Sequence, residues 1–388
     1  MDPDLTPDQR LLRETAERFV ETSLPLAKLR ELIDAGGEVD PSYRRAAAEV
    51  GWFAFLAPES LGGGSVSGVG LLDAAVLAEV RGRQLQPGSF IDTNLAVATL
   101  SREGSAHQQA AILPDLITGE AAAAWAVADP SGDWSGGAGA RAEAVPGGFR
   151  LSGRKGLVVE AQSARWLLLT ATAPEGPTQF LLPASTPGVA VEVLPGLDLT
   201  RRLCEVTFDG VVVDDAALLG APGRAGAAVD AQLRLAAVLS SAETAGAMQY
   251  LFDLTVRYCK DRIAFGRPIG SFQAIKHQLA DSSLALEMSH AVVTAAARAL
   301  AAEGDDTPGD GGDGGAAAAR AAHAASLTKA FVSDAAIELA HNCWQHFGGI
   351  AYTWEHDFHL YLRRVTTDAS LYGSPAWHRE RVCQLAGI

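Results

Sequence analysis

Cysteines, basic residues and long apolar runs are all scarce in this chain of 388 residues. The four cysteines, Cys204, Cys259, Cys343 and Cys383, form no CxxC pair and no metal-ligand spacing, so we expect reduced thiols and no metal site. A net charge of −15 argues against a nucleic-acid partner, because phosphate binding needs a concentrated basic face. No run of about 18 uninterrupted apolar residues occurs, and the start lacks a basic region followed by an apolar one. We therefore expect a soluble, cytoplasmic protein with no membrane partner.

At 388 residues the chain is long enough for two or three packed units, and its 48% hydrophobic residues can form a substantial core. From Leu5 to about Leu116 the apolar residues follow a helical period. In the first helix this pattern places Leu11, Leu12, Ala16, Phe19 and Val20 on one face. We expect an N-terminal helical domain over residues 1–120.

The spacing of the apolar residues then changes twice, first to a strand pattern and then back to a helical one. Short β-branched or alternating runs, such as "RWLLLTATA", "TQFLLPA", "VAVEVLP" and "LCEVTFDGVVV", predict a middle β domain, a barrel or sandwich, over residues 121–222. Long helices are predicted at about 227–262, 272–303 and 316–347, so residues 223–388 should form a C-terminal four-helix-bundle domain. Strands flanked by helical blocks indicate the α+β class. The Gly- and Asp-rich segment 303–315 is expected to be a mobile loop.

Two segments carry residues suited to a nucleotide. In "RIAFGRPIGSFQAIKHQLAD", Arg262 offers a rigid fork of donors for a diphosphate, Phe265 a flat face, and Gln273 an amide. In "QHFGGIAYTWEHDFHLYLRR", the pair 348–349 removes two side chains at a helix end and Gln345 lies one turn earlier. Each segment alone reads as an ordinary helix connection or helix stop, but their order and separation make a shared site the better interpretation.

These two segments, and the succession of helices, strands and long helices, resemble the acyl-CoA dehydrogenase family over essentially the whole chain. The resemblance implies FAD as cofactor, an acyl-CoA substrate and an electron-transfer flavoprotein or similar acceptor. In the homotetrameric members the two segments reach across an interface to the FAD of the neighbouring subunit. By this resemblance the cofactor-binding residues are Arg262, Phe265, Gln273, Gln345, Gly348 and Gly349.

The family's contacts to the flavin ring look degraded here. Where the family has a Thr or Ser followed by Glu-Pro, this chain has Ala128, Asp129 and Pro130. Where it has a Lys followed by Trp-Ile-Thr or Ser, this chain has Lys155 and then the apolar run 157–159. Neither the stacking ring nor the hydroxyl remains.

The catalytic base is also missing. The family's C-terminal carboxylate falls at Tyr372, Gly373 or Ser374, and the alternative position on the long helix falls at Ala236. None of these can remove a proton alpha to a thioester. Glu243, two turns further along that helix, is the best surviving carboxylate for a relocated base, although acidic residues on helices more often pair or cap. We therefore assign no catalytic residue to this chain.

Three functions fit these observations. The leading hypothesis is the non-catalytic subunit of an α2β2 acyl-CoA dehydrogenase of fatty acid or steroid side-chain β-oxidation, in which a paralogous partner supplies the base. The ending "LYGSPAWHRERV" resembles the base-lacking subunits of actinobacterial enzymes of this kind. The second hypothesis is a homo-oligomeric flavoenzyme that works alone with a relocated base. The third is a flavin-free protein for acyl-CoA binding or assembly.

Overall fold

The computed structural model describes residues 5–137, 139–305 and 314–388, and its first part is helical. The segment expected to be mobile lies largely outside the described residues. Thr6 caps the first helix in a reciprocal pair with Gln9, and Ser105 with Gln108 caps the sixth in the same way. The N-terminal helices are α1 (Pro7–Ser23), α2 (Leu26–Asp34), α3 (Pro41–Glu49), α4 (Gly70–Arg83), α5 (Phe90–Glu103) and α6 (Ala106–Ile117).

One residue of the predicted face of α1 is wrongly placed. Leu12, Ala16 and Val20 are buried as expected, because they recur every fourth residue along one stripe. Leu11 is 60% exposed. It precedes Leu12 by about 100° around the helix axis, which turns it away from the core.

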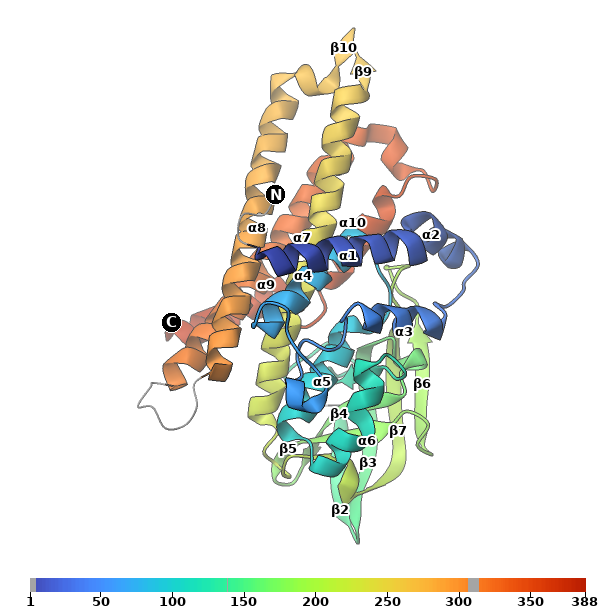
Figure 1. The fold of residues 1–388 in the computed structure, drawn as a ribbon, viewed down its shortest axis with the longest axis vertical. Helices are drawn as coiled ribbons and strands as arrows, with labels where there is room; N and C mark the ends of the chain where they lie inside the picture. The colour runs from blue at the N-terminus through green and yellow to red at the C-terminus, as the bar shows by residue number, and fades with distance from the viewer. Residues whose placement is uncertain (1–4, 138, 306–313) are drawn as a thin grey trace.

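The middle of the chain forms a mixed sheet with the order β6-β7-β3-β2-β4-β5-β8, while β1 pairs with β4 in parallel. The four strands predicted from the sequence are all present, as β4 to β7. Strands β2 and β3, which no sequence pattern singled out, pair antiparallel at the lower end of Figure 1. The strands are β1 (Ala123–Ala126), β2 (Ala140–Val145), β3 (Gly148–Val159), β4 (Trp166–Ala173), β5 (Gly176–Pro183), β6 (Val189–Leu194), β7 (Leu203–Asp214) and β8 (Leu218–Leu219).

Strand β4 explains why its run of leucines does not alternate with polar residues. Leu168 packs into the core shared with the helices, whereas Leu167 and Leu169 pack into a second core between the strands. Because both faces of β4 are covered, a continuous apolar run is the expected pattern. The sheet is thereby fixed against α5, which contacts β1.

The three predicted long helices run side by side, as α7 (Gly226–Asp261), α8 (Gln273–Asp305) and α9 (Gly314–Phe347). A short hairpin of β9 (Ile263–Ala264) and β10 (Arg267–Pro268) joins α7 to α8 at the top of Figure 1. After the 3-10 turn η5 (Gly348–Tyr352), helix α10 (Phe358–Asp368) leads to α11 (Pro375–Ala386), which packs along α9.

Helix α8 is also long and apolar enough, by length and composition, to cross a membrane over Gln273–Glu303. Only 28% of its most apolar window is buried in this chain. The core helices of a soluble bundle can be equally long and apolar, and α8 packs against α9 and α7. The sequence pattern had indicated no membrane span, and in the structure part of the apolar surface of α8 is exposed.

Candidate functional site

The residues predicted to hold a nucleotide lie at one end of the long helices. Arg262 is the C-terminal cap of α7, and Gln273 is the first residue of α8. Gln345 lies in the last turn of α9, directly before η5. Tyr258 of α7 stacks on Phe347 of α9 with ring centroids 4.3 Å apart, so the two segments belong to the same end of the bundle.

These residues face outward and do not enclose a pocket of their own. Arg262, Gln273, Gln345 and Gly349 are exposed. Phe265 is 95% exposed and has a left-handed backbone with φ of 51°. A Cβ added at position 348 or 349 would meet no atom within 4 Å. The surface they form is therefore open to another molecule, and its donors, flat ring and bare backbone fit the diphosphate and adenosine of FAD.

Large apolar side chains are exposed beside this polar surface. Ile263 is 56% exposed and Tyr352 is 77% exposed. Exposed apolar groups grouped around polar ones are typical of contact surfaces between proteins. Both segments thus have the character of an interface.

The other side of the expected site is filled by aromatic rings. Tyr372, one of the three positions at which the family's carboxylate can fall, is buried and stacks on Trp125 at 6.3 Å with an interplanar angle of 20°. Trp134 lies 5.1 Å from the same ring. All three side chains are at most 3% exposed. We call Trp125, Trp134 and Tyr372 the aromatic cluster.

Asp92 on α5 fixes the orientation of this cluster. Its Oδ1 accepts a hydrogen bond from the Tyr372 hydroxyl at 2.9 Å, and its Oδ2 accepts one from the Trp125 backbone N–H at 2.9 Å. Burial raises the pKa of Asp92 to about 7, against the opposing effect of these two hydrogen bonds. Sequence reasoning missed Asp92 and Trp134, since their proximity to Tyr372 depends on three segments far apart in the chain.

The flavin-ring positions that looked degraded are structural. The Lys155 ammonium donates to the Val127 carbonyl at 2.8 Å, and burial lowers the pKa of Lys155 to about 8. Asp129 accepts hydrogen bonds from Ser131 and Asp133 within its own loop. Leu157, at the place of the stacking indole, has a left-handed backbone with φ of 52°. These residues do not fit a flavin ring.

Glu243 belongs to a buried ion-pair network. Its oxygens lie 3.0 Å from Arg81 Nε and 2.6 Å from Arg201 Nη2, and Arg201 also pairs with Asp368 at 2.5 Å. Burial would raise the pKa of Glu243, but the charges of Arg201 and Arg81 outweigh it and lower that pKa. A carboxylate held by two guanidinium groups is a poor general base, and Ala236 is a fully buried methyl group.

The geometry therefore defines an α+β protein with exposed polar residues at one end of its long helices and a buried aromatic cluster beside the sheet. Comparison with known proteins identifies the class. Residues 6–120 match the family described as "Acyl-CoA dehydrogenase, N-terminal domain", and residues 226–385 match "Acyl-CoA dehydrogenase, C-terminal domain".

Relatives of known name agree over the full length. The acyl-CoA dehydrogenase IpdE2 of Mycobacterium tuberculosis is 32% identical over 95% of this chain and 94% of its own. The IpdE2 of Mycolicibacterium smegmatis is 30% identical over 96% of each. This chain belongs to the acyl-CoA dehydrogenase family, whose members are FAD-dependent oxidoreductases acting on CH–CH bonds.

Solved structures share the fold. "PigA with FAD and proline" superposes with a TM-score of 0.87 at 25% identity, covering 100% of this chain and 99% of the other. A variant of the "Tcur3481-Tcur3483 steroid ACAD" superposes with a TM-score of 0.84 at 26% identity, covering 98% of this chain and 97% of the other. The ChsE4-ChsE5 complex from Mycobacterium tuberculosis superposes with a TM-score of 0.87 at 24% identity, covering 100% of this chain and 99% of the other.

Proposed function

We propose that this chain is the non-catalytic subunit of a heteromeric, cytoplasmic acyl-CoA dehydrogenase and that it supplies half of the FAD site of a paralogous partner. The observation that carries the proposal is the aromatic cluster. Tyr372, Gly373 and Ser374 are the positions at which the family's base can fall, and the Tyr372 hydroxyl donates a hydrogen bond to Asp92. A phenol buried among other rings supports the proposal, because it carries no carboxylate that could take the alpha proton.

The outward-facing surface supports the other half of the proposal. Arg262 would neutralise part of the diphosphate charge, and the amides of Gln273 and Gln345 would donate to oxygens of the nucleotide. Phe265 would cover a flat face of it, while Gly348 and Gly349 would allow its close approach. Bound FAD supplies the hydride acceptor for α,β-desaturation of an acyl-CoA. This chain's contribution would be to hold the nucleotide end, whereas the partner's base would act on the substrate.

Relatives with two different subunits favour an assembly of this kind. The ChsE4-ChsE5 and Tcur3481-Tcur3483 structures each contain two differently named proteins in their descriptions. The Tcur3481-Tcur3483 protein is described as a steroid ACAD. A fatty acid or steroid side-chain thioester is accordingly the substrate class that we propose for the assembly, with an electron-transfer flavoprotein or similar protein as acceptor.

The decisive experiment is co-expression with an adjacent dehydrogenase-like open reading frame, followed by measurement of FAD per chain. We expect one FAD for each pair of unlike chains. Replacing Arg262 with Ala should lower the FAD content of the purified complex about tenfold at equal flavin supply, because an ionic hydrogen bond to diphosphate contributes about 1.5 kcal/mol or more.

The matched control is Arg150→Ala, which removes an exposed arginine from β3. It should leave the FAD content unchanged. If this chain purified alone is yellow and reduces a dye with an acyl-CoA, it is a self-sufficient flavoenzyme and the proposal fails. Protein that stays colourless with every co-expressed neighbour would make it a flavin-free assembly protein.

A further inference from the structure

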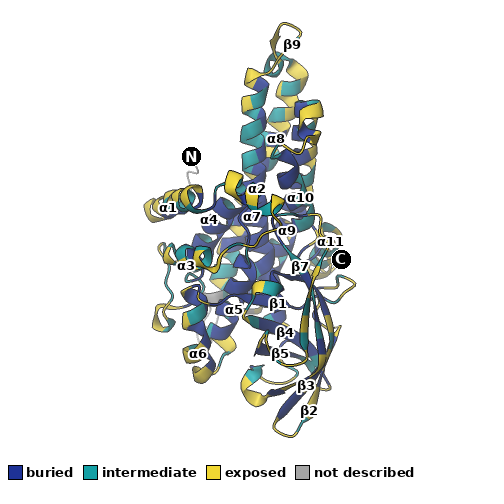
Figure 2. Cartoon of the chain, turned by 90° about the vertical axis from the view of Figure 1, so that its right-hand side faces the viewer, coloured by how far each residue is buried: buried dark blue, intermediate teal, exposed yellow. Residues whose placement is uncertain are grey.

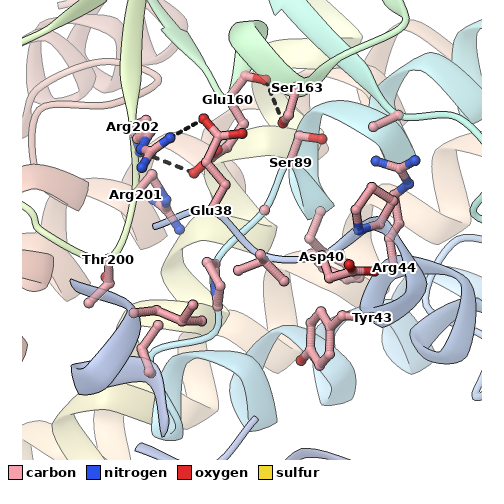
Figure 3. A pocket seen from close by; sticks show the side chains of 18 of the residues that line it. Glu38, Asp40, Tyr43, Arg44, Ser89, Glu160, Ser163, Thr200, Arg201 and Arg202 are labelled. Atoms are coloured by element: carbon pink, nitrogen blue, oxygen red, sulfur yellow. Dashed lines mark hydrogen bonds and ion pairs between the residues drawn. The ribbon is translucent and has the colours of Figure 1, made fainter. Parts of the chain in front are cut away.

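A cavity of about 630 Å³ lies between the N-terminal helices and the sheet (Figure 3). Helices α2 and α3, the segment 87–90 before α5, and the loops 160–163 and 199–202 form its walls. In the described chain, neither the aromatic cluster nor any of the six predicted FAD residues lines it. Its volume falls within the roughly 300–1,000 Å³ of small-molecule sites. It is a second candidate site, separate from the cofactor surface.

Most of the inner wall is apolar. Leu29 and Phe53 are buried, and Leu32 and Ile33 are partly exposed toward the space between α2 and the sheet. Phe90 and Trp52 pack edge to face with ring centroids 6.1 Å apart. Such a surface favours a ligand with an apolar body, since burying apolar area contributes about 25 cal/mol per Å².

Glu160 supplies one of the acceptor groups of the wall. It is 8% exposed and lies in the left-handed region with φ of 54°, which is uncommon for a residue with a side chain. Its Oε1 accepts from the Arg202 backbone N–H at 3.0 Å, and its Oε2 accepts from Gln162 Nε2 at 2.8 Å. Among the ion pairs of the described residues, none involves Glu160. A carboxylate has about four acceptor positions, so it can accept further hydrogen bonds.

The cations around the cavity are already engaged. Arg202 pairs with Glu38 and donates to the carbonyls of Gly36 and Gly37, which holds the connection from α2 to α3 across the cavity. Arg44 donates to the carbonyls of Gly119 and Glu120. Arg81 and Arg201 are neutralised by the Glu243 network. Each of these arginines in the described part of the chain already has a partner. The cavity therefore offers little attraction to an anionic ligand, which would also lie near the carboxylates of its walls.

We propose that this cavity binds a neutral, largely apolar alcohol whose hydroxyl donates a hydrogen bond to Glu160 and whose body lies against Leu32, Ile33 and Phe53. The hydroxyl satisfies an acceptor that is otherwise only partly used. This assignment does not depend on the proposed function, because it involves no residue of the FAD surface.

Calorimetric titration of the full-length chain tests it with three probes that share one fused-ring body: decahydro-2-naphthol, decahydro-2-naphthalenone and decahydro-2-naphthoate. We expect the alcohol to bind about tenfold more tightly than the ketone, which cannot donate, and the carboxylate to bind more weakly still. Glu160→Gln keeps the size of the side chain and removes its charge. It should reduce the preference for the alcohol over the carboxylate at least about fivefold.

A second pair of variants tests the location. Leu32→Trp places an indole in the cavity and should abolish binding of the alcohol, whereas Leu11→Trp, on exposed α1, should leave it unchanged. Equal binding of the three probes, absence of binding at millimolar concentration, or full binding by Leu32→Trp would overturn the proposal. Arg262→Ala should not affect this titration, so failure here and failure of the FAD assignment are distinguishable.

Discussion

Tyr372 and Asp92 show how two residues far apart in the chain fix a buried aromatic ring. Tyr372 adopts a left-handed backbone with φ of 60°, which directs its ring onto Trp125 and its hydroxyl onto Asp92. The adjoining Gly373 has φ of 103°, and a Cβ there would lie 2.7 Å from His378 Nε2. Backbone strain of this kind persists only where surrounding contacts hold it. Tyr372 is therefore built into the protein as a packed residue.

Asp92 should make the folding stability depend on pH. Its folded pKa of about 7 lies above the ordinary value of about 3.9, so the folded chain binds this proton more tightly than the unfolded chain does. The stabilisation is complete below pH 4 and is lost as pH rises toward 7. Asp92→Asn should remove this slope, on the order of 1 kcal/mol per pH unit, in guanidinium unfolding at pH 4.5, 5.5, 6.5 and 7.5.

The control for this pH dependence is Asp209→Asn, which changes an exposed carboxylate within β7. Its stability should follow that of the unchanged chain at every pH. If Asp92→Asn retained the full slope between pH 4.5 and 7.5, the Asp92 carboxyl would not be the group that titrates.

Among the helices, α4 and α7 are held together at two glycines. A Cβ on Gly82 would lie 1.7 Å from the Glu243 carbonyl oxygen, and a Cβ on Gly246 would lie 2.0 Å from the Glu79 carbonyl oxygen. The backbones therefore approach where side chains are absent, which brings Arg81 on α4 within 3.0 Å of Glu243 on α7. The buried ion-pair network depends on this close crossing.

Gly246→Ala should separate these helices and destabilise the chain by about 3 kcal/mol, because an added methyl group in a closed contact forces the backbones apart. Chemical denaturation monitored by circular dichroism measures this change. The matched control is Gly196→Ala, whose added Cβ would have only an ordinary contact at 3.7 Å. A Gly246→Ala chain as stable as the control would show that the helix pair can relax without cost.

For the molecule as a whole, the proposed assembly predicts that the exposed apolar side of α8 contacts a second chain. Leu284 is 62% exposed and Met288 is 44% exposed, one turn apart on this helix. Figure 2 shows the long helices rising away from the more deeply buried centre of the molecule. An assembly would cover this surface and place the residues near Arg262 against a second chain.

Leu284→Asp should therefore lower the mass of the co-purified assembly, since a charge buried in an apolar contact is costly. Light scattering after size exclusion gives the mass directly. Leu11→Asp, at a site of similar exposure on α1, is the control and should leave the assembly intact. Retention of full assembly mass by Leu284→Asp would exclude this face of α8 from the interface.

The helical and strand periods of the sequence determined much of this structure by themselves. The three long helices begin and end within two residues of the predicted positions, and the predicted strands are present, because period and turn residues act over a few neighbours. The resemblance carried by the segments 262–281 and 345–364 likewise pointed to the correct family. The assignment of six residues to FAD and the division at 120 and 222 stay predictions.

Only the tertiary structure decided what the altered positions do. The sequence showed that Tyr372 is no base, but only the structure shows that its hydroxyl donates to Asp92, 280 positions away. Glu243 looked available on its helix, and Arg81 and Arg201 from two other segments make it an ion-pair residue. Contacts between distant segments depend on how the helices and the sheet pack, and no local pattern of residues encodes that packing.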